Sequence, residues 1–155
     1  MSFGFSYIEI VISVAILALL ATAATPYLEQ TVIRKKESEL RSDLRDIRTA
    51  IDAYKKAYDE GHLENRVGAS GYPGNLEELV EGVPDVLDPK KTKMRFLRRL
   101  PADPFFSGEA KSASDTWGKR AYDSDPDQPK EGDDVFDVYS LSDQKGLNGI
   151  PYRLW

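Results

Sequence analysis

The sequence predicts an α+β protein in which one long N-terminal helix packs its second half on a small antiparallel β-sheet. Three observations carry this prediction. Residues 5–28 form an apolar run with a single charged side chain, which suits a membrane. An amphipathic stripe of apolar residues follows between Leu40 and Tyr58. Two short runs with strand-like alternation, 117–122 and 135–141, occur near the C-terminus.

The apolar run is long enough to cross a membrane as a helix. At ~1.5 Å per residue, residues 5–28 span roughly 36 Å, against a hydrocarbon core of about 30 Å. A cleaved signal peptide is one alternative, because residues 21–23 resemble a cleavage site, but the basic start of such peptides is missing. A plain single-pass anchor is a second alternative, and it leaves the one charge, Glu9, unexplained.

The apolar stripe places the second half of the helix on a soluble core. Its members are spaced four, three, four, three and four residues apart: Leu40, Leu44, Ile47, Ile51, Tyr54 and Tyr58. No Gly or Pro interrupts residues 31–60, and Gly61 is a natural stop. We therefore expect a nearly continuous helix over about residues 5–59. A bend is expected near residues 22–26, because Pro26 removes one backbone hydrogen bond.

Short elements separated by loops are expected in the rest of the chain. Asn75 is a candidate cap for a helix over 76–81, which Gly82 would end. Residues 84–115 carry four prolines and are typical of a loop, with room for a short helix or strand around 94–100. The strands come next, and residues 142–155 are expected to form a closing loop.

Composition and charge exclude several classes of protein. All 21 Lys and Arg residues, and all but one of the 26 Asp and Glu residues, follow residue 28, so residues 29–155 have a net charge of about −4. An acidic balance of mixed signs is unlike a nucleic-acid-binding surface. The absence of cysteine excludes disulfides and thiolate metal sites. The one histidine, His62, supports neither a zinc site nor a catalytic triad, so we predict no enzyme.

A motif at residues 4–9, Gly-Phe-Ser-Tyr-Ile-Glu, heads the apolar run, and Pro26 follows within that run. This arrangement resembles the processing motif of type IV prepilins and pseudopilins, many of which carry a proline in the N-terminal helix. The resemblance implies a pilin-like fold. It also implies that a membrane prepilin peptidase cuts between Gly4 and Phe5, and that the new amine on Phe5 is methylated.

Glu9 gains a physical role from this resemblance. A carboxylate inside lipid costs several kcal/mol unless it is paired. The resemblance implies that Glu9 meets the charged N-terminal amine of a neighbouring subunit during assembly, which would offset desolvation and set the axial register. Pro26 would permit bending where the helix bundle meets the heads. The alternative is that Glu9 reaches water at the membrane surface.

The resemblance also divides and orients the chain. It implies a leader, residues 1–4, a transmembrane and filament-core helix, 5–28, and a soluble head, 29–155, that lies in the periplasm and includes the second half of the long helix. The charges disagree with this orientation. Residues 1–3 carry no Lys or Arg, whereas residues 34–36 are all basic, and the positive-inside rule would place the basic side in the cytoplasm. We follow the motif rather than the rule.

Three segments narrow the resemblance to the major pseudopilin of type II secretion, the G-type subunit. They are Leu-Pro-Ala-Asp-Pro-Phe at 100–105, Trp-Gly-Lys-Arg-Ala-Tyr at 117–122 and Val-Phe-Asp-Val-Tyr-Ser at 135–140. A subunit of this kind is implied to build a homo-oligomeric helical filament that supports protein export across the outer membrane. Its implied partners are the prepilin peptidase, other pseudopilins and an assembly platform in the bacterial inner membrane.

Calcium is the one ligand that the resemblance implies, in a loop after the last strand. Ser142, Asp143 and Asn148 are the candidate ligands. Calcium takes six to eight oxygen ligands, and this loop offers one carboxylate. A turn held by hydrogen bonds is therefore an equal alternative.

Two other functions stay open at this point. One is a type IV pilus subunit used in adhesion, motility or DNA uptake. The other is a membrane-tethered binding module that never polymerises. The proline-rich head and the lack of a disulfide-bounded C-terminal loop favour a pseudopilin over a pilus subunit.

Overall fold

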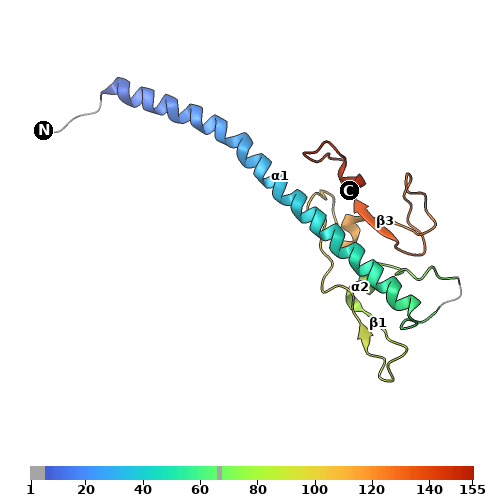
Figure 1. Ribbon diagram of the computed structural model, residues 1–155. Coiled ribbons are helices and arrows are strands. Elements are labelled where there is room, and N and C mark those ends of the chain that lie inside the picture. Colours follow the sequence, from blue (N-terminus) through green and yellow to red (C-terminus); the bar gives the residue numbers. More distant parts are fainter. Residues whose placement is uncertain (1–5, 66–67) are drawn as a thin grey trace. The chain divides into compact units, whose positions relative to one another are not determined.

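The structure is a computed structural model that describes residues 6–65 and 68–155, without the side chains of residues 21–28. It divides into two compact units. The N-terminal unit is Met1–Lys36 and the C-terminal unit is Glu37–Trp155. Helix α1, Tyr7–Asp59, runs through both and has 53 residues (Figure 1). The continuous helix predicted over about residues 5–59 is thereby confirmed.

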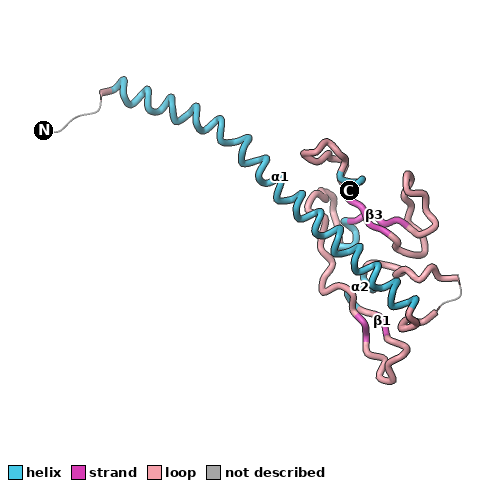
Figure 2. The backbone as a smooth tube through the Cα atoms, in the orientation of Figure 1, coloured by secondary structure: helices cyan, strands magenta, loops and turns pink. Residues whose placement is uncertain are grey.

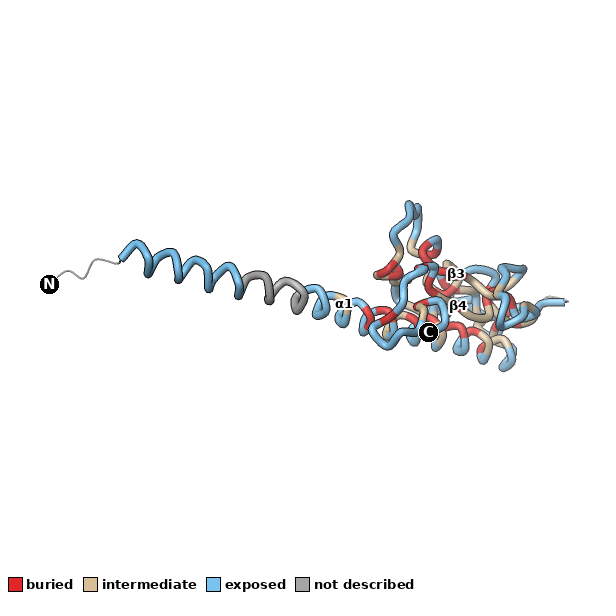
Figure 3. Tube along the Cα trace, turned by 90° about the horizontal axis from the view of Figure 1, so that it is seen from above, coloured by how far each residue is buried: buried red, intermediate tan, exposed pale blue. Residues whose placement is uncertain are grey.

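In the N-terminal unit, the described apolar side chains of α1 are exposed, and Figure 3 colours these residues pale blue. These side chains include Ile8, Ile10, Val11, Ile12, Val14, Ile16, Leu17 and Leu20. Among the helical residues that the structure describes, no stretch is both long and apolar enough to span a bilayer. The bend predicted at residues 22–26 falls on residues whose side chains lie outside the described part.

In the C-terminal unit, α1 buries one stripe in the core. Leu40, Leu44, Ile47 and Ile51 are all at most 2% exposed, and Tyr54 is nearly buried. The stripe belongs to the hydrophobic core of this unit, whose other fully buried members are Leu76, Leu79, Trp117, Val138 and Tyr152. The amphipathic half of the predicted helix is therefore confirmed, because removal of these side chains from water is what holds it on the core.

Helix α2, Glu77–Glu81, follows the loop after α1. The Oδ1 atom of Asn75 accepts the backbone N–H of Glu78 at 3.0 Å, as expected for a cap. Gly82 ends the helix with φ +79°, and a Cβ there would lie 2.7 Å from the carbonyl oxygen of Met94. Glycine is therefore required at this position.

The predicted single sheet is replaced by two separate two-stranded sheets, both antiparallel (Figure 2). Strand β1, Val83–Pro84, pairs with β2, Lys93–Met94, inside the region expected to be mainly loop. Strand β3, Trp117–Arg120, pairs with β4, Asp137–Ser140. The two strands predicted from alternation are thus confirmed, although each is shorter than its run. Two 3₁₀ turns, η1 at Ala113–Thr116 and η2 at Tyr152–Leu154, complete the elements.

Gly118 of β3 lies against the ring of Tyr139, its partner on β4. A Cβ at Gly118 would lie 2.3 Å from Cε2 of Tyr139. We expect Gly118→Ala to lower the free energy of unfolding by about 1–2 kcal/mol, because the ring must move. Gly74→Ala is the matched control, since its Cβ would meet nothing closer than 3.4 Å. Urea unfolding measures both, and equal midpoints for the two variants would contradict the expectation.

Candidate functional site

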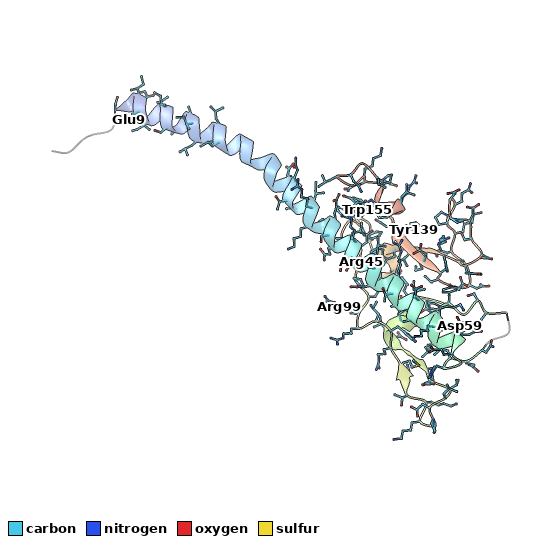
Figure 4. All side chains as sticks on the ribbon, viewed as in Figure 1. Glu9, Arg45, Asp59, Arg99, Tyr139 and Trp155 are labelled. Atoms are coloured by element: carbon cyan, nitrogen blue, oxygen red, sulfur yellow. The ribbon has the colours of Figure 1, made fainter. Side chains whose placement is uncertain are left out.

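Glu9 lies in the first turn of α1 (Figure 4). Its N–H donates to the carbonyl oxygen of Ser6 at 3.0 Å, and its own carbonyl oxygen accepts the hydroxyl of Ser13 at 2.7 Å. A negative charge here also interacts favourably with the helix dipole. The predicted processing residues, Gly4 and Phe5, lie outside the described residues, and of Pro26, the other predicted assembly residue, only its place within α1 is described.

The described apolar side chains of the N-terminal unit form a surface that a single chain leaves in contact with water. A helix that is apolar all round is normally buried in lipid or among other helices. Glu9 is the only charged residue before Glu29. Residues 7–20 of α1 therefore carry one carboxylate among mainly apolar side chains, which is the arrangement that the assembly prediction requires.

A second site, which the sequence did not predict, is the anchor of the C-terminal loop on α1. Glu37 is 6% exposed, and its Oε1 atom accepts the N–H of Leu147 at 2.6 Å and the hydroxyl of Tyr152 at 3.2 Å. Glu37 lies three residues before Leu40, so it continues the spacing of the buried stripe. That spacing was the available signal, but a carboxylate at its end normally faces water.

Tyr152 connects this anchor to the core. Its side chain is 1% exposed, and its ring stacks on Phe105 at a centroid distance of 4.0 Å. Burial, and next the nearby charge of Glu37, raise the pKa of Tyr152 to about 12. The hydroxyl therefore stays protonated at neutral pH and donates to the carboxylate, which is a charge-assisted hydrogen bond.

Arginines of α1 hold the last residue of the chain. The guanidinium of Arg41 lies 4.3 Å from the ring centre of Trp155, a cation–π geometry. Arg48 donates through Nη2 to the carbonyl oxygens of Trp155 and Val138, both at 3.1 Å, and pairs with Asp137 at 2.8 Å. The C-terminal loop is thus attached to α1 by a buried carboxylate and by two cations.

The predicted calcium ligands lie in this loop with their oxygens partly engaged. The hydroxyl of Ser142 accepts the N–H of Gln144 at 3.3 Å, and Oδ1 of Asn148 accepts the N–H of Ile150 at 3.0 Å. Within the part of the chain that the structure describes, no three acidic, His or Cys side chains gather to hold a metal. Asp143, Ser142 and Asn148 alone fall short of six ligands. Calcium binding therefore stays a prediction.

The three segments that resemble the G-type pseudopilin, 100–105, 117–122 and 135–140, contact one another in the fold. The indole N–H of Trp117 donates to the carbonyl oxygen of Pro101 at 2.8 Å. The buried carboxylate of Asp103 accepts the hydroxyl of Ser140 at 2.5 Å and the N–H of Phe105 at 2.8 Å. Residues 100–105, β3 and β4 therefore form one hydrogen-bonded cluster that contributes side chains to the core.

The chain is 33% identical over 103 residues to the type II secretion system core protein G of Pseudomonas aeruginosa, which covers 66% of this chain and 67% of that protein. No protein-family model matches the chain, and no solved structure matches it significantly. On this similarity, the chain belongs to the family of type II secretion core protein G.

Proposed function

We propose that the chain is a structural subunit of a type II secretion pseudopilus. After cleavage behind Gly4 it polymerises through its N-terminal helix, and the filament supports protein export across the outer membrane. The observation that carries the proposal is the described apolar surface of α1, with Glu9 as its one charge. The similarity to a type II secretion core protein gives the system in which such a helix would act.

The same apolar side chains would hold the subunit in the membrane before assembly and in the filament afterwards. Before assembly, the apolar residues of α1 contact lipid in the inner membrane, as a single pass with the head in the periplasm. In the filament, neighbouring helices replace the lipid, so the hydrophobic contact area is exchanged rather than lost. Small residues in this segment, such as Ala15 and Ala18, permit close helix packing.

In this proposal Glu9 favours entry of the subunit into the filament and sets its axial position there. Its carboxylate has no charged partner of its own chain among the described residues, and an unpaired carboxylate is costly in lipid. The amine of Phe5 on an adjacent subunit, exposed by cleavage, is the matching cation. Entry into the filament would therefore relieve a cost that the membrane imposes, and only one axial offset brings the two charges together.

Mass spectrometry of the chain, extracted from the envelope of a bacterium that makes a prepilin peptidase, tests the processing step. We expect a chain that begins at N-methylated Phe5, because the peptidase recognises the motif at 4–9. A Gly4→Ala variant should keep its leader and stay unmethylated, since the bulkier residue blocks cleavage. A chain that begins after Ala23 would instead identify a signal peptide and would overturn the proposal.

A further inference from the structure

The outward side of α1 in the C-terminal unit is bordered by opposite charges. At about 3.6 residues per turn, two sets of charged residues flank the buried stripe. One set, the acidic edge, is Glu39, Asp43 and Asp46. The other set, the basic edge, is Arg41 and Arg45, and the exposed Asp52 follows about two turns later on the same side. Between them, over residues 38–53 and away from the core, the side chains are short: Ser38, Ser42, Thr49 and Ala53.

Among the described residues, the basic edge forms no ion pair with a carboxylate of its own chain. Arg41 and Arg45 are exposed, and neither lies within ion-pair distance of a carboxylate among the described residues. The Nε atom of Arg45 donates only to the carbonyl oxygen of Arg41, at 3.2 Å. Arg48, one turn on, is different because it pairs with Asp137.

The basic edge also lines a groove. Its volume is about 460 Å³, and its walls include Leu44, Ile150 and Leu154. Figure 4 shows Trp155 on one side of α1 and Arg99 on the other. The groove thus combines two guanidinium groups, one of them stacked on Trp155, with an apolar wall, which suits carboxylates carried on a helix.

The acidic edge carries more negative charge than its own chain neutralises. Partial burial raises the pKa of Asp43 to about 6, and the nearby carboxylates of Glu39, Asp46 and Asp103 add to the shift. Arg99 is the one cation that opposes it. No ion pair of the described residues includes the acidic edge. A second cation brought to this edge would therefore be stabilising.

We propose that a second copy of this chain docks on the outward side of α1, with its acidic edge in the basic groove of the first copy. The inference rests on the proposed function, because it names the contact between neighbouring heads. The contact is heterologous, so each copy uses its two edges for two different neighbours and the contact repeats along a filament. The short side chains between the edges allow the two helices to approach closely.

The acidic loop at residues 123–134 of a second copy is the competing occupant. Its charges are partly used within the chain, since Glu131 lies 3.8 Å from Lys119 and Asp134 accepts the N–H of Tyr122 at 2.9 Å. The acidic edge has no such partners, and parallel helices would bring it beside the basic edge. The observations therefore favour the acidic edge.

Charge reversal in the full-length chain tests the pairing. The variants are Arg45→Glu, Asp46→Lys and the two combined, both positions being exposed. We expect each single reversal to lower the amount of sedimentable filament by about tenfold, because like charges then face each other. The combined variant should return to within about twofold of the unaltered chain. Lys90→Glu, an equal charge change at an exposed position in the loop between β1 and β2, is the control and should assemble normally.

The outcomes separate this inference from the proposed function. Normal assembly of all single variants would overturn the inference and leave the pseudopilus proposal standing. Failure of the combined variant to recover would also overturn it, since the edges would then not face each other. Recovery of Arg45→Glu by Asp125→Lys instead would assign the groove to the acidic loop. An unaltered chain that never assembles would overturn both proposals. Thermal unfolding of each variant checks that the heads stay folded.

Discussion

A chain carrying Glu9→Gln is expected to fold and enter the membrane but to build almost no filaments. The neutral amide removes the cost of a charge in lipid, about 2.5–3.5 kcal/mol, and it also removes the partner for the amine of Phe5. Both changes favour the membrane-held subunit over the assembled one. At about 1.4 kcal/mol per tenfold, the filament yield should fall roughly a hundredfold. Electron microscopy and sedimentation of envelope fractions measure the yield.

The matched control is Glu29→Gln, the same chemical change at the next acidic residue of α1, which is exposed. This variant should assemble at normal levels, because Glu29 lies beyond the apolar run. Filaments of the Glu9→Gln variant in normal amounts would contradict the pairing mechanism. If neither this variant nor the unaltered chain forms filaments, the chain is better described as a membrane-tethered binding module.

Glu37→Ala is expected to give a large loss of stability in the C-terminal unit. It leaves the N–H of Leu147 and the hydroxyl of Tyr152 without their acceptor in a buried site. Unsatisfied buried groups cost about 1–3 kcal/mol each, so a loss of about 3 kcal/mol and a fall in Tm of roughly 10 °C are expected. Thermal unfolding followed by circular dichroism measures it. Glu39→Ala, two residues on and exposed, should change Tm by less than about 2 °C.

Thermal unfolding also compares how much Glu37 and a bound calcium ion each stabilise the C-terminal loop. If Glu37 is the main anchor of the C-terminal loop, addition of a calcium chelator will lower Tm by less than Glu37→Ala does. A larger effect of the chelator would mean that an ion at Ser142, Asp143 and Asn148 holds the loop instead. The pH dependence is a further check. Because the pKa of Tyr152 is raised from 10.0 to about 12, its contribution is present below pH 10 and is lost as the pH rises through 12.

The long helix could be predicted from sequence because its signals are local and periodic. A stripe at helical spacing, no internal Gly or Pro after Thr31, and a glycine stop determined both its presence and its buried side. The pairing of β1 with β2 could not be predicted. Each strand has two residues, too few to show alternation, and one of them is Pro84. Their pairing depends on the loop between them rather than on a pattern.

The candidate sites likewise fall into one that the sequence shows locally and others that form only when distant residues meet. Glu9 was predicted because a lone charge in an apolar run is visible in the sequence itself. Glu37 was missed because its partners are 110 and 115 residues away, and no local pattern shows them. Arg48 was missed for the same reason, since it contacts Asp137 and Trp155 only after folding.

The long separation between Glu37 and its partners has a consequence for biogenesis. The buried stripe of α1 leaves the ribosome early, whereas the strand and the loop that cover it are made last. Throughout synthesis, α1 therefore presents an uncovered hydrophobic stripe, and the head closes only after Leu147 and Tyr152 have been made. Contacts between distant parts of a chain form slowly, so chains truncated before Tyr152 are expected to aggregate or be degraded rather than to persist as shorter heads.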